Sequence, residues 1–254
     1  MRYFFVYFTL LILAANITSC QKQSADVQLT PLTDYYPLQV GNSYTYRLDS
    51  TVYLAFGTNE ATISYVAKDS IVSTYNDNTG RTAYLVYRYL TDTLMKAPFA
   101  YSTAYSIVPT GKTIEVTDAN NLHFINLVQP IEAATTWQGN AYIDTKSFTT
   151  DLAYMDNWNY TYQNINAPFT VLKGSIDSTI TIVGIDEIRP DDTPFDPQYF
   201  KQRDYAEEVY GKGIGLVYKE FIHWVWQPPD GINPGHYEDG SFGIKMNLMD
   251  YSAK

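Results

Sequence analysis

Apolar and polar residues alternate through most of the chain after Ser43, which is the period of a β-strand with one buried face. The alternating segments are rich in Tyr, Thr, Val and Ile, the residue types that suit a pleated sheet. Clusters of Gly, Pro, Asn and Asp separate them, as is typical of tight turns. The pattern predicts an all-β fold, a single antiparallel β-sandwich, curved sheet or half-barrel, with little helix beyond a short turn near residues 152–160. The clearest alternating segments are residues 44–49, 62–72, 81–90, 179–183 and 216–226.

Two long irregular segments interrupt the alternation, residues 189–200 and 227–241, and each contains three prolines. Loops of this length are more often functional or mobile than purely connecting. A chain of 254 residues can bury one large β core. We therefore expect a single domain over residues 35–254 with two candidate functional loops.

The first twenty residues do not follow the β pattern. Met1 and Arg2 give a positive start, and residues 3–15 form an uncharged, mostly apolar run. The run is shorter than the roughly 20 apolar residues that span a bilayer. Together with the small polar residues that follow, it is typical of a secretory signal peptide. We expect residues 1–19 to be removed.

A cysteine stands where this apolar run ends. The sequence Ile-Thr-Ser-Cys at residues 17–20 resembles the bacterial lipobox, whose cysteine is diacylated and becomes the new N-terminus. Cys20 is then a lipidation site and residues 20–34 an anchor with a polar tether. Because Gln21 is not the aspartate that retains many such proteins at the inner membrane, we expect the outer membrane of the cell envelope, with either face open. The alternative is a structural cysteine beside an ordinary secretion site.

Composition and charge exclude several classes of protein. With 45% hydrophobic and 17% charged residues, the chain is too apolar to be disordered. One cysteine cannot form an intramolecular disulfide or a thiolate zinc site. The 17 basic and 27 acidic residues give a formal charge of −10, which argues against a nucleic-acid partner.

An internal similarity links residues 37–44 and 130–137. Each segment places a proline and an aliphatic residue before a small-residue turn, and then Ser or Thr and a large aromatic residue. Two similar sheet halves would produce this pattern. A common way of opening a strand, used twice, is the interpretation that we favour, because true repeat architectures recur at least three times.

Three segments carry a resemblance to a known family. Residues 36–46 match a YPL-x-x-GN-x-W-x-Y opening, with Tyr44 in place of the usual Trp, and residues 210–220 match a late KG-x-GLV-x-x-E strand. With residues 136–140, these resemble a family of uncharacterised Bacteroidetes-type lipoproteins. The resemblance implies a β-rich extracytoplasmic domain over the mature chain and no established reaction.

No pattern of catalytic or cofactor-binding residues stands out. The glycines at 211–215 run straight into a predicted strand rather than a helix, which argues against nucleotide binding. The three histidines fall in no metal-ligand spacing, and no nucleophile motif occurs. We therefore expect no enzyme activity and no cofactor. Asp191, Asp192 and Asp196 have the composition of a calcium loop without its spacing, and a solvated acidic loop explains them as well.

Aromatic residues are the remaining candidates for binding. Tyr and Trp combine a flat apolar face with a hydrogen-bonding edge, which suits stacking on sugars or contact with a partner. The alternative is the ordinary aromatic core of a β protein. The candidate ligand-binding residues are Trp137, Trp158, Tyr218, Trp224 and Trp226.

Together these features favour a non-enzymatic, membrane-anchored binding or structural module with a glycan, lipid or protein partner. The alternatives are a carrier-like half-barrel that shelters lipid or acyl chains, and a glycan-binding or glycan-processing component. A deep, dry apolar cavity would favour the carrier, and a shallow groove with exposed Trp and polar groups would favour glycan or protein binding. Carboxylates clustered in a cleft would favour an enzyme.

Overall fold

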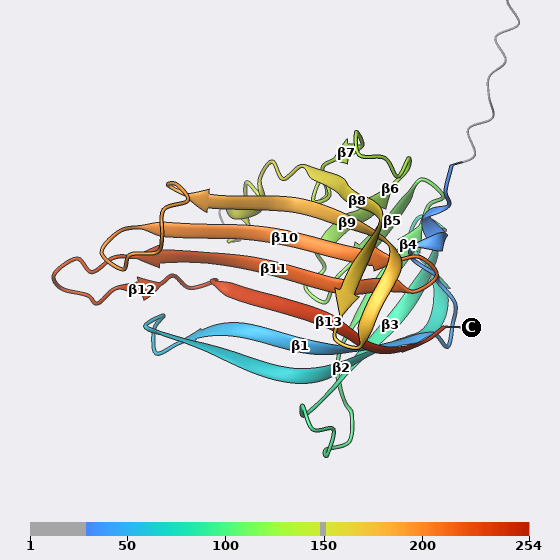
Figure 1. The fold of residues 1–254 in the computed structure, drawn as a ribbon, viewed down its shortest axis with the longest axis horizontal. Helices are drawn as coiled ribbons and strands as arrows, with labels where there is room; N and C mark the ends of the chain where they lie inside the picture. Colours follow the sequence, from blue (N-terminus) through green and yellow to red (C-terminus); the bar gives the residue numbers. More distant parts are fainter. Residues whose placement is uncertain (1–28, 148–150, 254) are drawn as a thin grey trace, which may run out of the picture.

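A computed structural model describes residues 29–147 and 151–253, and these form one continuous antiparallel sheet (Figure 1). Along the sheet the strands follow the order β6-β5-β4-β3-β2-β1-β13-β11-β10-β9-β8-β7, and β12 pairs with β11. Most neighbours in the sheet are neighbours in the sequence, as in a meander of hairpins. The strands are β1 (Ser43–Leu54), β2 (Asn59–Asn76), β3 (Thr82–Thr91), β4 (Ala100–Pro109), β5 (Thr113–Thr117), β6 (His123–Val128), β7 (Thr136–Trp137), β8 (Tyr160–Val171), β9 (Gly174–Arg189), β10 (Lys201–Gly211), β11 (Gly215–Gln227), β12 (His236–Tyr237) and β13 (Phe242–Ser252).

The all-β prediction is confirmed, and of its three forms the structure adopts the curved sheet that nearly closes as a half-barrel. Within the described ranges, helical structure is limited to two 3-10 turns, η2 (Leu32–Asp34) and η3 (Ala153–Met155). The second lies inside the segment where the sequence predicted a helical turn. Among the residues that the structure describes, no helix is long and apolar enough to cross a bilayer.

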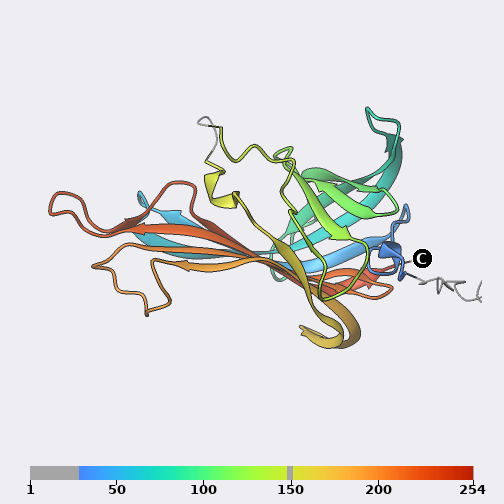
Figure 2. The same cartoon turned by 90° about the horizontal axis from the view of Figure 1, so that it is seen from above.

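The sheet curves until its two ends meet. Trp137 on β7 donates its indole N–H to the carbonyl oxygen of Ile125 on β6, 2.8 Å away. Next to it, the hydroxyl of Tyr162 on β8 donates to the carbonyl of Val128 (2.7 Å) and accepts from the amide of the same residue (2.9 Å). Figure 2 shows β3 to β6 raised from the plane of the long strands, which brings β6 over β8. These side-chain hydrogen bonds, with a backbone bond from the amide of Ile125 to the carbonyl of Gly139 (2.6 Å), close the half-barrel at this seam.

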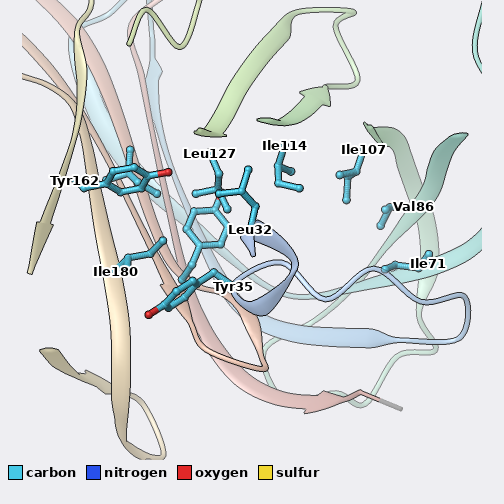
Figure 3. Close-up of a cluster of buried hydrophobic side chains, with 11 residues drawn as sticks. Leu32, Tyr35, Ile71, Val86, Ile107, Ile114, Leu127, Tyr162 and Ile180 are labelled. Atoms are coloured by element: carbon cyan, nitrogen blue, oxygen red, sulfur yellow. The ribbon is translucent and has the colours of Figure 1, made fainter. Parts of the chain in front are cut away.

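Apolar side chains fill the inner side of the half-barrel. Leu32 and Tyr35, at and just after η2, enter it from one end (Figure 3) and are 4% and 2% exposed. They pack with residues from both halves of the sheet, among them Ile71, Ile107 and Ile180. Because Leu32 belongs to this core, the packed domain includes part of the segment expected to be tether, and its boundary precedes Tyr35.

The two sides of the sheet are distinct. On the inner side of β11, Phe221 packs edge-on against Trp158 and His223 stacks on Tyr154 at 3.7 Å, so the segment around η3 covers this side. Because neighbouring residues on a strand alternate between faces, Tyr218 and Trp224 point to the opposite side. We call that side the outer face.

The long strands extend beyond the half-barrel toward one end of the molecule, which we call the loop end (Figure 1). The β1–β2 turn lies there, with the two irregular segments at residues 189–200 and 227–241. The chain enters the described domain at the opposite end. In both of the similar proline-containing segments, the Ser or Thr and the aromatic residue are the first two residues of a strand, but β1 continues for 12 residues whereas β7 ends at Trp137.

Candidate binding groove on the outer face

The outer face carries a groove of about 360 Å³ across the middle of the sheet. This volume is at the lower end of the range of about 300–1,000 Å³ found for small-molecule sites. Four adjacent strands line the groove, and its residues other than Ile244 share one side because they are partners or diagonal neighbours across the strands. The lining residues are Arg47, Asp49 and Thr51 on β1, Thr62 and Ser64 on β2, Gly243, Ile244 and Lys245 on β13, and Glu220 and Ile222 on β11.

Strand register brings these residues together. Lys245 on β13 is the partner of both Asp49 on β1 and Glu220 on β11. Gly243, two residues earlier, lies between Thr51 and Ile222 in the same way. β1 and β13 come from opposite ends of the chain, so only their pairing creates the groove.

Gly243 lies at the bottom of the groove, and because it has no side chain the groove is deeper there. A Cβ atom at this position would lie 3.1 Å from the Cβ of Thr51, a tight contact that the strand avoids by using glycine. Glycine weakens the interior of a strand and often marks a place where another group approaches closely. The hollow over Gly243 is such a place.

Charged side chains and hydroxyls form the walls. Arg47 Nε lies 2.7 Å from Asp49 Oδ1, and the hydroxyl of Ser64 donates to the same oxygen at 2.6 Å. Across the groove, Lys245 Nζ is 3.4 Å from Glu220 Oε1. Although partial burial raises the pKa of Asp49, the hydrogen bonds from Ser64 and Arg47 outweigh it and leave this pKa below its ordinary value. The walls therefore carry two cations and two carboxylates, with no net charge.

Aromatic residues stand at both ends of the groove. At the end toward the half-barrel, Tyr218 donates its hydroxyl to Glu220, and Lys245 lies over its ring, 5.5 Å from the centroid. At the loop end, the rings of Trp224 and Tyr237 meet edge to face at 5.7 Å, and Tyr237 also packs on Tyr53 at 4.1 Å.

The structure divides the five aromatic residues predicted from the sequence. Tyr218, Trp224 and Trp226 follow one another on the outer face of β11, although Tyr218 and Trp226 are each 9% exposed. Trp226 also donates its indole N–H to the carbonyl of Pro197 at 3.1 Å. Trp137 and Trp158 lie on the inner side. Trp137 belongs to the seam, and Trp158 is 2% exposed with its indole N–H bonded to the carbonyl of Tyr154.

Sequence reasoning missed the charged and small residues of the groove. Arg47 and Asp49, like Gly243 and Lys245, are spaced two apart and therefore share a face of their strand. That spacing was visible in the sequence. What it did not show was that the two strands are neighbours.

A second polar group lies on the inner side of the half-barrel, and we call it the inner polar cluster. Arg88 holds both carboxylate oxygens of Asp69, at 2.7 and 2.6 Å, and the hydroxyl of Tyr105 donates to one of them at 2.9 Å. Glu208 pairs with Lys219 at 2.8 Å. It also accepts hydrogen bonds from Tyr210 and Asn126.

Ion pairing outweighs burial in this cluster. Burial acts to raise the pKa of Glu208, but the charge of Lys219 and the three hydrogen bonds bring it below its ordinary value. Burial likewise acts to lower the pKa of Arg88, and the neighbouring Asp69 raises it above its ordinary value. Burial raises the pKa of Tyr210 and Tyr105. The cluster thus consists of charged pairs whose hydrogen-bonding capacity is largely used.

A second groove of about 480 Å³ lies beside the β8–β9 hairpin and the end of β13. Its lining is more apolar than that of the first, with Val171, Ile176 and Leu248 beside Lys173 and Asp250. It is open at the surface, and its apolar lining residues also pack in a hydrophobic cluster with Tyr46 and Val217.

The acidic loop between β9 and β10 does not bring its carboxylates together around one point. Asp191 accepts hydrogen bonds from the backbone and hydroxyl of Thr193 and lies 3.6 Å from Lys201 Nζ, whereas Asp196 accepts from the amide of Gln198. Within residues 29–147 and 151–253, no group of three His, Cys, Asp or Glu side chains has the arrangement of a metal site.

Comparison with known proteins adds little. No protein-family model matches the chain, and no curated protein matches it. Among solved structures, the chain is similar to a DUF1329 family protein from Desulfovibrio piger, with 13% identity over 85% of this chain and 87% of that one. The TM-score is 0.20, so this likeness carries no argument about function.

Proposed function

We propose that this protein is a lipid-anchored protein of the cell envelope, attached through Cys20 at the outer membrane, whose β domain binds a neutral glycan without catalysis. The groove on the outer face is the binding site. Cys20 lies outside the described residues, so the anchor rests on the lipobox and the apolar run before it. The observation that carries the binding proposal is the groove over Gly243, polar along its walls and aromatic at both ends.

The chemistry of the walls matches a ligand rich in hydroxyl groups. Carboxylates accept hydrogen bonds, cations donate them, and threonine and serine hydroxyls do both. Because the charges of Arg47 and Lys245 balance those of Asp49 and Glu220, the walls favour neither an anion nor a cation. The partly exposed ring of Trp224 suits the apolar face of a sugar ring. Tyr218 is 9% exposed and its ring packs on Phe169, so it shapes the end of the groove.

The inner side of the half-barrel supports this proposal over a lipid carrier. A carrier needs a dry apolar cavity, whereas the charged pairs Asp69–Arg88 and Glu208–Lys219 lie on the inner side here. Leu32 and Tyr35 fill one end of the core. Both described grooves are open at the surface.

The state of the carboxylates supports binding over hydrolysis. A glycosidase needs one carboxylic acid with a raised pKa to protonate the leaving group. The pKa of Asp49 in the groove is lowered, and so is that of Glu208 in the inner polar cluster. Each is held by a cation.

The test is affinity electrophoresis of the full chain through gels that contain a neutral or an anionic polysaccharide. We expect at least one neutral polysaccharide to retard the protein. Gly243→Val, which fills the hollow, and Trp224→Ala should each weaken this binding at least tenfold, or about 1.4 kcal/mol. Tyr75→Ala, which removes an exposed aromatic residue from the far end of β2, is the matched control and should bind normally.

Lys245→Met provides a second test if Gly243→Val folds poorly. It removes a hydrogen-bond donor from the wall of the groove, and because the side chain is half-exposed we expect the variant to fold. Circular dichroism verifies the fold of each variant. Unchanged binding by folded Gly243→Val or Lys245→Met, or retardation only by anionic polysaccharides, would overturn the proposal.

A further inference from the structure

The loop end of the sheet presents apolar side chains that have nothing to pack against. Phe56 in the β1–β2 turn is 96% exposed, and Ile232 between β11 and β12 is 91% exposed. Tyr199, in the β9–β10 loop, is 69% exposed. Single exposed apolar residues are ordinary on protein surfaces, but three loops that converge on one end with such residues mark an interaction site.

Hydrogen bonds and ring contacts connect the three loops to one another. The amide of Tyr237 on β12 donates to the carbonyl of Gly57 in the β1–β2 turn at 2.9 Å. The ring of Tyr237 packs on Trp226, and the indole N–H of Trp226 in turn donates to the carbonyl of Pro197 in the β9–β10 loop. Phe195 of the same loop packs edge-on against Trp226 at 5.5 Å. The exposed side chains therefore belong to loops that contact one another.

Ile232 is held in place by its own loop. Both oxygens of Asp230 are used: Oδ1 accepts the amides of Ile232 (2.9 Å) and Asn233 (2.7 Å), and Oδ2 accepts the side-chain amide of Asn233 at 3.0 Å. These bonds lower the pKa of Asp230 to about 2, so the carboxylate stays charged and continues to accept the hydrogen bonds that hold the turn. A pre-organised loop loses less entropy on binding a partner.

The turn that exposes Phe56 has an unfavourable backbone conformation. Ala55 and Phe56 have φ angles of +51° and +55°, in the left-handed region that residues with side chains avoid. Such positions persist where the surrounding structure enforces them, and they cluster at functional sites. Here the neighbouring β12 strand enforces the turn.

Charge indicates what the surface fits. The three loops at residues 55–58, 189–200 and 228–241 contain six acidic residues against one basic residue, Arg189, a formal balance of −5. Anionic bilayers would be repelled by this charge, whereas a protein surface with Lys and Arg around an apolar pocket would be attracted. The loop end also lies at the opposite end of the long axis from the point where the chain enters the domain (Figure 1).

We propose that the loop end, with Phe56, Ile232 and Tyr199 as its exposed apolar side chains and with carboxylates on the same loops, docks onto a protein whose apolar pocket is rimmed by basic residues. The proposal does not depend on the outer groove or its ligand.

The test is photo-crosslinking in the native host, with p-benzoylphenylalanine in place of Phe56 or Ile232 in the full chain. The same probe in place of Tyr75, exposed at the opposite end of β2, is the control. We expect one protein adduct shared by the two loop-end positions and absent at Tyr75. Mass spectrometry should map it to a partner peptide that carries Lys or Arg.

Charge reversal tests the recognition chemistry. Asp192→Lys combined with Asp239→Lys, two exposed loop positions, should reduce the adduct at least fivefold while circular dichroism and the thermal midpoint stay unchanged, and 1 M salt should do the same. Adducts to lipid, to a second copy of this chain, or to a peptide without basic residues would overturn the proposal. Adducts no stronger than at Tyr75, or unaffected by charge reversal, would also overturn it.

Discussion

The indole N–H of Trp137 donates to the carbonyl oxygen of Ile125 at 2.8 Å, and this bond helps to join β7 to β6, the strands at the two ends of the sheet. The two residues are 12 apart in sequence. In the order of strands across the sheet, however, β6 and β7 are the first and the last, and all the remaining strands of that order lie between them. Tyr162, which packs on Trp137 with ring centroids 4.8 Å apart, reinforces the seam.

Replacing Trp137 should therefore loosen the half-barrel. Trp137→Phe keeps an aromatic ring but removes the donor, and we expect a loss of about 1–3 kcal/mol in the free energy of unfolding, because a partly buried carbonyl loses its partner. Chemical denaturation measures this loss. Trp224→Phe, on the outer face, is the matched control and should cost less; an equal cost would argue against the seam.

The pair of Arg88 and Asp69 should show strong coupling in a double-mutant cycle. Arg88→Met leaves the carboxylate of Asp69, which is 2% exposed, without its cation, at a cost of about 3 kcal/mol. Asp69→Asn in the same chain should restore part of this stability because the unpaired charge is gone. Denaturant unfolding of the two single variants and the double variant gives the coupling, and additive effects would contradict the prediction.

Stability should fall in acid, partly through Glu208. Its pKa in the folded protein lies below the ordinary value of 4.5, so the folded state binds this proton less tightly than the unfolded state does. The stabilisation is then fully present above about pH 4.5 and is lost as the pH falls through the folded pKa. Glu208→Gln should flatten this acid limb in unfolding curves measured between pH 3 and 7, and an unchanged slope would exclude Glu208 as its source.

Two glycines with nearly the same backbone angle test the joint at the loop end. Gly57 and Gly80 have φ of +78° and +79°, but a Cβ at Gly57 would lie 1.9 Å from the carbonyl oxygen of Tyr237, whereas nothing lies within 4 Å at Gly80. Gly80→Ala should cost about 1–2 kcal/mol from the left-handed conformation alone. Gly57→Ala should cost more and should speed amide exchange in the β1–β2 turn and β12. Equal costs would show that the contact with Tyr237 is unimportant.

Cys20→Ala tests the anchor. If Cys20 is the lipidation site, this variant should no longer incorporate a lipid analogue in cells and should leave the membrane fraction. Ser24→Ala, four residues later in the expected tether, is the control and should be labelled normally. Labelling of Cys20→Ala would exclude the lipobox.

The strands could be predicted from the sequence because their signal is local. Alternation with period two and glycine-rich turns depend only on residues a few positions apart, and residues 44–49, 81–90 and 216–226 fall in strands except for Arg81, which directly precedes β3. The long loops at 189–200 and 227–241 were visible for the same reason, although β12 (His236–Tyr237) forms inside the second. Period two also separated the two faces of β11.

Only the tertiary structure decided which face is which. Both faces of β11 are apolar, so Tyr218 and Trp224 on one side and Phe221 on the other were equivalent until Trp158 covered Phe221. The groove depends on pairing between β1 and β13, which are separated by most of the chain. Sequence alternation places a residue on a face of its own strand, but strand order and closure depend on the free energy of the whole sheet. That is why the aromatic candidates were visible in the sequence, whereas the groove between them was not.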